Sequence, residues 1–301
     1  MTKKLFRFSL YTAVSLIVLA AVAVTALLWN SHRKIHRVMS VAVAPVAYSS
    51  DTTAVERGKY LYQARGCAEC HGDSGTGRAF VDAPDGLYGR GANLTLGNGS
   101  AVQKYTEQDW VRSIRHGIKP DGRPLFLMPS EDYARFSDKD VADIVAYVRA
   151  LPAQDAEPGP LYRLSLIVKL VHGAGILKDS AEKIDHALPP AQPVPAGATL
   201  EHGRYLVQTC AGCHGQNLQG GSIPGGPPDW PPAANLAAGQ TGVMGKYPSA
   251  EQFKTMMHTG AWPDGSKVNS VKPFLSFQHI NDVDLQAMFI YLQSLGSTPA
   301  P

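Results

Sequence analysis

Two short stretches hold all four cysteines of the 301-residue chain, and a histidine directly follows each pair. The first reads CAECH and the second CAGCH. Two thiols separated by two residues can reach the two vinyl groups on one edge of a porphyrin, and the next imidazole then lies under the iron. The spacing therefore predicts two sites for covalent c-type haem. The expected thioether residues are Cys67, Cys70, Cys210 and Cys213, and the expected proximal iron ligands are His71 and His214.

Two other chemistries use the same cysteine spacing. A C-x-x-C pair also serves in four-cysteine zinc sites and in redox-active dithiols. The histidine after each pair, and the lack of any further cysteine in the chain, favour haem attachment over both.

The two motifs belong to a longer repeat. ERGKYLYQ precedes the first motif and EHGRYLVQ the second, and both copies continue with Ala-Asn-Leu, a Pro-Asp-Gly turn and a closing helical stretch. We expect Ser137 and Asn281 to cap the two closing helices. Self-similarity over about 95 residues predicts two copies of one helical unit, each starting with a short helix that runs into its cysteine motif.

The N-terminus predicts a membrane anchor. MTKKLFR is basic, and Phe8 to Trp29 is a 22-residue run whose polar members are Ser, Thr and Tyr alone. Such a run can cross a bilayer core of about 30 Å as a helix. A cleaved signal, cut after small residues at 21–23 or 42–44, is the alternative to an uncleaved anchor. Basic residues flank both ends, so charge does not fix the orientation.

The chain divides into five segments on these patterns. They are a basic flank with the anchor (1–37), a spacer (38–53), a first unit (54–151), a Pro-rich linker with a short helix (152–199) and a second unit (200–297). The helix within the linker, in LYRLSLIVKLVHG, is too short to span a membrane. We expect it to lie in the groove between the units, with a second membrane contact as the alternative.

The formal net charge of +3 does not describe the chain after residue 37. Six of the 28 Lys and Arg residues and none of the 25 acids lie in residues 1–37, so the remainder carries 22 basic and 25 acidic residues, a net charge of −3. Nothing in this pattern suggests nucleic-acid binding.

With both motifs, the repeat and a downstream Met-Pro, the chain resembles tandem class I cytochromes c over residues 55–151 and 200–296. It is similar to membrane-anchored dihaem c-type cytochromes, including the cytochrome subunits of bacterial membrane-bound dehydrogenases. The resemblance implies an all-α fold of two cytochrome c domains behind a transmembrane helix, with two haem c groups. It also implies a single-pass protein of the bacterial inner membrane whose haem domains face the periplasm.

The resemblance further implies a methionine on the far side of each iron. In the first unit the candidate is Met128, nine residues before Ser137 and followed by proline. The same count back from Asn281 reaches Lys272, which is also followed by proline. We expect Lys272 to ligate the second iron as a neutral amine, which would put this haem at a lower potential than the first.

Two alternatives remain for the second iron. Another side chain can be the sixth ligand, and the possible donors are Met244, Met256, Met257, His258 and His279. Otherwise the iron is open, with Lys272 as a cation beside an anionic ligand. The remaining histidines are expected at the surface, namely His32, His36, His116, His172, His186 and His202.

The leading functional hypothesis is a membrane-tethered electron carrier that breaks no substrate bond. It would relay electrons from a donor such as a periplasmic dehydrogenase to a soluble cytochrome or a terminal oxidase. The alternative is a dihaem redox enzyme that handles a small oxidant or a sulfur oxyanion at the second haem. A structural or zinc-binding role would require the cysteine motifs to lack haem.

Overall fold

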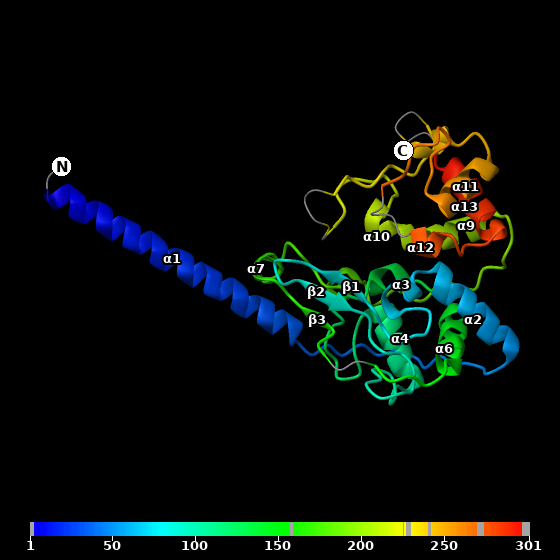
Figure 1. The fold of residues 1–301 in the computed structure, drawn as a ribbon, viewed down its shortest axis with the longest axis horizontal. Helices are drawn as coiled ribbons and strands as arrows, with labels where there is room; N and C mark the ends of the chain where they lie inside the picture. The colour runs from blue at the N-terminus through cyan, green and yellow to red at the C-terminus, as the bar shows by residue number, and fades with distance from the viewer. Residues whose placement is uncertain are drawn as a thin grey trace.

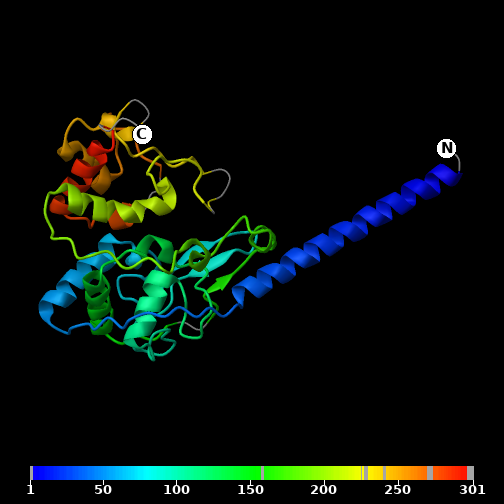
Figure 2. The same ribbon diagram turned by 180° about the vertical axis from the view of Figure 1, so that it is seen from behind.

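The computed structural model describes residues 3–156, 159–224, 226, 230–239, 242–269 and 274–296. One long helix, α1 (Lys3–Ile35), projects from a body with two lobes (Figures 1 and 2). In the described ranges helices dominate and the strands are few and short, which confirms the helical fold class. We call the part from α2 to α8 the first lobe and the part from α9 to α13 the second lobe.

The first lobe contains both the first repeat and the linker that follows it. Its helices are α2 (Thr52–Ala64), α3 (Cys67–His71), α4 (Glu107–His116), α5 (Ser130–Tyr133), α6 (Asp138–Ala150), α7 (Leu166–Gly173) and α8 (Ser180–Lys183). Its strands are β1 (Ala79–Asp82), β2 (Tyr88–Arg90) and β3 (Tyr162–Arg163), which pair antiparallel in that order. The linker therefore adds a strand to the first lobe.

The second lobe contains counterparts of α2 to α6 of the first. They are α9 (Leu200–Leu206), the 3₁₀ turn η1 (Val207–Cys210), α10 (Ala211–His214), the 3₁₀ turn η2 (Val243–Lys246), α11 (Ala250–Thr259), α12 (Phe274–Phe277) and α13 (Asp282–Ser294).

Both closing helices begin at the predicted caps. The Ser137 hydroxyl accepts the Asp140 amide at 3.1 Å, and the Asn281 side chain accepts the Asp284 amide at 2.8 Å. Each bond satisfies one of the amides that a helix start leaves without an intrahelical partner.

A helix crossing forms the frame of each lobe. α2 packs across α6, and α9 packs across α13. A Cβ added to Gly58 would lie 1.8 Å from the Asp143 carbonyl oxygen, and one added to Gly203 would lie 2.0 Å from the Ala287 oxygen. The repeated glycines are needed because the backbones nearly touch at these crossings.

Each lobe has its own apolar core. The first core is built around Tyr62, Trp110 and Val141, and the second around Tyr247, Met244 and Leu285. Ala64, at the end of α2, belongs to the second core. The two lobes are therefore packed together and not merely tethered.

The segment between α1 and α2 lies against the first lobe. The Met39 amide donates to the Gly122 carbonyl at 2.9 Å, and Val43, Val46 and Tyr48 pack against the first core. This segment holds the C-terminal end of α1 against the first lobe.

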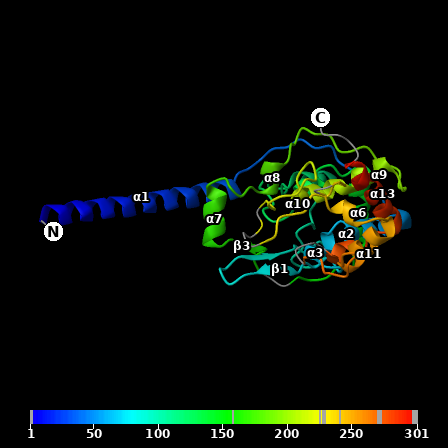
Figure 3. The ribbon, with the colours of Figure 1, turned by 90° about the horizontal axis from the view of Figure 1, so that it is seen from above.

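The expected position of the linker helix is wrong. α7 packs against the last turns of α1 and not in the groove between the lobes, as the view from above also shows (Figure 3). The backbone carbonyl of Leu27 lies against Gly173 of α7. A close contact between such distant residues leaves no signal in the pattern of the linker itself.

Two histidines expected at the surface are buried. His172 is 0% exposed and His202 is 6% exposed. The Nδ1 atom of His172 lies 3.0 Å from the Ser31 hydroxyl, and that of His202 bonds the backbone of Gly197. These bonds give both Nδ1 atoms a partner, because a buried polar group without one is costly. The Nε2 atom of His172 has no hydrogen-bond partner among the described residues and lies 4.0 Å from the Asp179 carboxylate.

Candidate haem sites

The cysteines of the first motif lie on a single helical turn, whereas Cys210 ends η1 and Cys213 lies on α10. Cys67 and Cys70 are three residues apart on α3, so both side chains project from one face. A loop presses onto this turn, since a Cβ added to Gly91 would lie 2.0 Å from the Cys70 carbonyl oxygen. The backbone of the turn is thus held in place by this close contact.

The histidines of the two motifs make equivalent hydrogen bonds. The Nδ1–H of His71 donates to the Ala92 carbonyl at 2.9 Å, and the Nδ1–H of His214 donates to the Ala234 carbonyl at 2.7 Å. Both acceptors come from the Ala-Asn-Leu triplets of the repeat. The bond fixes the tautomer that has its lone pair on Nε2, the arrangement typical of metal-ligating histidines.

The protonation of the first motif suits a haem anchor better than a redox dithiol. Burial raises the pKa of Cys67 to about 12 and that of Cys70 to about 11. A reactive dithiol needs a lowered pKa, because the thiolate is the nucleophile. Burial also lowers the pKa of His71, which keeps the imidazole neutral, as an iron ligand must be.

A shared four-cysteine zinc site does not form. Cys67 packs against the first core and Cys210 against the second. Zinc–sulfur bonds of about 2.3 Å would require all four thiols around one point.

Met128 lies beside the same core as Cys67 and is half-buried. Its backbone carbonyl accepts the Ser180 hydroxyl at 2.5 Å and the Ser130 amide at 2.8 Å. The structure therefore brings Met128 and Cys67 to one cluster, while ligation by Met128 remains a prediction.

A cavity lies beside His214 in the second lobe. Four methionines line it, together with aromatic and aliphatic side chains; they are Met244, Met256, Met257 and Met288. The first three are among the donors considered from the sequence. Met288 was missed, although its place on the buried face of the closing helix follows from helical periodicity. Lys272 lies outside the described residues, so its ligation stays a prediction.

The two histidines considered as donors are placed elsewhere. His258 is exposed, and its Nε2 lies 2.9 Å from the Ile280 carbonyl. His279 is exposed on the turn after α12.

Each core also leaves a buried polar group that suits an incoming acidic ligand. Among the described residues, neither the indole N–H of Trp110 nor the hydroxyl of Tyr247 has a hydrogen-bond partner. Tyr247 lines the methionine-rich cavity. Buried donors normally have acceptors, and the carboxylates of a haem are acceptors. The donor set and the histidine tautomer fit a haem in each lobe, and the second lobe adds the cavity beside His214.

The cysteine motifs touch the opposite lobe. Glu69, inside the first motif, accepts the Ser276 amide at 3.1 Å. Asp132 of the first lobe bonds the amide of Gly212, inside the second motif. A Cβ on Gly212 would lie 2.3 Å from the Asp132 carboxylate, which explains why the second motif has glycine where the first has glutamate.

A matching pair of tyrosines closes the same interface. The hydroxyl of Tyr60 donates to Asp284 at 2.6 Å, and the equivalent Tyr205 donates to Asp140. Burial raises the pKa of Tyr205 to about 12, so the phenol keeps its proton. Equivalent residues thus meet reciprocally, as in a two-fold symmetric dimer.

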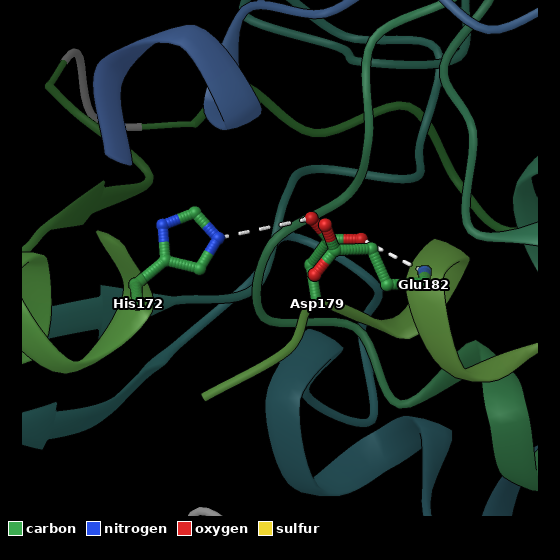
Figure 4. Close-up of side chains that lie close together, drawn as sticks. All are labelled: His172, Asp179 and Glu182. Atoms are coloured by element: carbon green, nitrogen blue, oxygen red, sulfur yellow. Dashed lines mark hydrogen bonds and ion pairs between the residues drawn. The ribbon is translucent and has the colours of Figure 1, made fainter. Parts of the chain in front are cut away.

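One further cluster has residue types that ligate metals. Donor atoms of His172, Asp179 and Glu182 lie within 4.8 Å of one another (Figure 4). However, Arg37 binds Asp179 at 2.7 and 2.8 Å, and Lys34 lies 2.9 Å from Glu182. Two cations already balance the two carboxylates, so the cluster is an ion-pair network that ties the end of α1 to α8.

Residues 53–148 match the family model described as cytochrome c oxidase, cbb3-type, subunit III, and residues 200–296 match the one described as cytochrome c. The chain is 26% identical to the fructose dehydrogenase cytochrome subunit of Gluconobacter japonicus, over 83% of this chain and 54% of that protein. It is 28% identical to the gluconate 2-dehydrogenase cytochrome c subunit of Pantoea cypripedii, over 82% of this chain and 60% of the relative.

A third relative is the cytochrome c subunit of the alcohol dehydrogenase (quinone) of Gluconobacter oxydans, 25% identical over 84% of this chain and 57% of the relative. The chain thus spans little more than half the length of these curated relatives.

Proposed function

Since the chain belongs to the dihaem c-type cytochromes, holds two covalently bound haem c groups and transfers electrons, we propose that it serves as the cytochrome subunit of a membrane-bound dehydrogenase. Haem iron supplies reversible one-electron exchange, and the chain supplies ligands, burial and position.

The first haem is assigned to Cys67, Cys70, His71 and Met128, and the second to Cys210, Cys213 and His214. The hydrogen bonds to Ala92 and Ala234 hold the two imidazoles in the ligating tautomer. Lys272 is proposed as the sixth ligand of the second haem. The four methionines that line the cavity beside His214 are the competing candidates for this ligand.

The observation that carries the proposal is the reciprocal interface between the lobes. Both cysteine motifs lie at it, one against Ser276 and the other against Asp132. Two carriers held at a common interface favour transfer from one to the other within the chain. A relay through both haems follows, rather than two independent carriers.

The partners are assigned from the relatives. Their names indicate dehydrogenases of a sugar, a sugar acid and an alcohol, so a dehydrogenase of this kind is the proposed donor. A soluble cytochrome or a terminal oxidase is the proposed acceptor. The apolar helix α1 is the proposed single span of the bacterial inner membrane. The haem lobes are proposed to lie on its periplasmic side.

The test is purification of the tagged chain from native membranes. We expect a dehydrogenase to copurify and its substrate to reduce both haems in the isolated complex. A chain that purifies alone and whose haems accept electrons only from chemical reductants would refute the assignment. In spheroplasts, added protease should digest the lobes, whereas in inverted vesicles they should be protected.

The dihaem enzyme is not favoured, because the relatives are described as cytochrome subunits and not as the catalytic components.

A further inference from the structure

The end of the apolar run marks where α1 leaves a membrane. From Phe8 to Trp29 the run is 22 residues long, or about 33 Å at 1.5 Å per residue, close to the thickness of a bilayer core. Trp29 is 70% exposed, and tryptophan is enriched at the lipid–water boundary. The boundary on this side therefore lies near Trp29.

α7 lies at that same depth. Its Gly173 touches the Leu27 backbone, and the Gly173 carbonyl accepts the Asn30 side chain at 2.7 Å. Figure 3 shows α7 lying crosswise to α1 at its base. A helix that crosses a membrane span at the boundary lies in the plane of the interface.

The outer surface of this segment is apolar and basic. Leu166, Ile167 and Ile176 are 59%, 65% and 79% exposed. Residues 161–178 contain no acid and three basic residues, which are Arg163, Lys169 and Lys178. All three of these basic side chains are exposed. Apolar side chains beside basic ones are typical of helices that bind anionic lipid surfaces.

The segment cannot swing away from α1. The bidentate pair of Arg37 with Asp179 and the pair of Lys34 with Glu182 hold the chain directly after the segment. Lys34 also donates to the His172 carbonyl at 3.3 Å. The depth of α7 is thus set by the depth of α1.

We propose that residues 161–178 form a second membrane contact, with Leu166, Ile167 and Ile176 in the acyl-chain boundary and the basic residues on anionic headgroups. This inference rests on the part of the proposed function that makes α1 a membrane span. It adds a surface that presses the first lobe against the bilayer and gives the lobes a fixed orientation.

The test is nitroxide accessibility in the full chain, reconstituted in vesicles of phosphatidylcholine and phosphatidylglycerol. Single labels are placed by Ile167→Cys and Ile176→Cys, with Val18→Cys in the span and Glu251→Cys on the exposed face of α11 as references. We expect the labels at 167 and 176 to resemble the label at 18, open to oxygen and several-fold less accessible to a water-soluble nickel complex than the label at 251.

Three results would overturn the proposal. Nickel accessibility equal to that at Glu251 would place α7 in water. An immobile label shielded from both reagents would mean that protein, such as a second copy of the chain, covers it. A nickel-accessible Val18 would remove the span itself, which separates failure of the anchor from failure of this contact.

A charge variant tests the headgroup contact. Lys169→Gln combined with Lys178→Gln should raise the nickel accessibility of the Ile167 label in anionic vesicles. Lys104→Gln, an exposed lysine elsewhere on the first lobe, is the matched control and should leave it unchanged. An equal response to both changes would contradict the proposed role of these lysines.

Discussion

The Nδ1–H of His71 and that of His214 donate to backbone carbonyls at equivalent positions, and this small detail decides which nitrogen can face a metal. The two copies differ at the positions proposed for the sixth iron ligand. Met128 sits beside the first core, whereas the second lobe offers four methionines around a cavity. At the scale of single residues, the two lobes therefore differ in the side chains available as a sixth ligand.

Substitution of the two candidates separates their roles. Met128→Ala should lower the reduction potential of one haem and open it to carbon monoxide, because thioether ligation holds the potential high. Lys272→Ala should abolish the low-spin ferric signal of the other haem, and Lys267→Ala serves as its control. A redox titration followed by spectra checks both. An unchanged low-spin signal in Lys272→Ala would assign the sixth ligand to one of the methionines that line the cavity beside His214.

At the scale of elements, the crossing of α2 over α6 and of α9 over α13 positions the cysteine motifs. The caps at Ser137 and Asn281 could be predicted from sequence because capping is local. The repeat also displayed Gly58 and Gly203, but not the carbonyl groups against which they pack. Those carbonyls lie on a distant helix, and only the folded chain brings them together.

The crossing can be tested with one methyl group. Gly58→Ala should destabilise the first lobe by about 1–3 kcal/mol, because its Cβ would lie 1.8 Å from the Asp143 carbonyl oxygen. Lys59→Ala, exposed on the same helix, should change stability by less than about 0.5 kcal/mol. Denaturant unfolding of the holoprotein measures both. Equal stability of the two variants would contradict the close approach.

The attachment of the linker to α4 should depend on pH. His116 lies 3.0 Å from His186 between their Nδ1 atoms, and burial, aided by His186, lowers the pKa of His116 from 6.5 to about 4. The folded state then binds fewer protons than the unfolded state between these values. The contribution of His116 to the free energy of unfolding is therefore full above pH 6.5 and is lost as the pH falls toward 4.

Thermal melts at pH 7 and pH 5 check this expectation. The wild type should melt at a lower temperature at pH 5, and His116→Gln should reduce the difference. A variant with an undiminished difference would show that other groups set the dependence.

At the scale of the whole molecule, the reciprocal interface joins two lobes that the repeat describes as copies. The repeat predicted two like units, but nothing in it predicted how they meet. The change from Glu69 to Gly212 within the motifs is explained only by Asp132 from the other lobe. The position of α7 against α1 was likewise beyond the sequence pattern, since it depends on contacts between residues far apart in the chain.

The interface should weaken when its tyrosines lose their hydroxyl groups. Tyr60→Phe removes a donor to a buried carboxylate and should cost about 1.5–3 kcal/mol. Tyr205→Phe should act similarly, and the double variant should slow electron equilibration between the haems after pulsed reduction. Tyr147→Phe is the control, because its hydroxyl makes an exposed bond of 3.5 Å within the first lobe. Unchanged equilibration in the double variant would argue against a relay through this interface.

The segment between α1 and α2 limits how the lobes can move relative to α1. The bond from Met39 to Gly122 and the ion pair of Arg37 with Asp179 hold the end of α1 on the first lobe. In a bilayer, such a body drifts sideways and spins about the normal, but it does not tumble. The proposed membrane-bound donor would then search for its docking face in two dimensions, and only the rotation about the normal would remain to be matched at each collision.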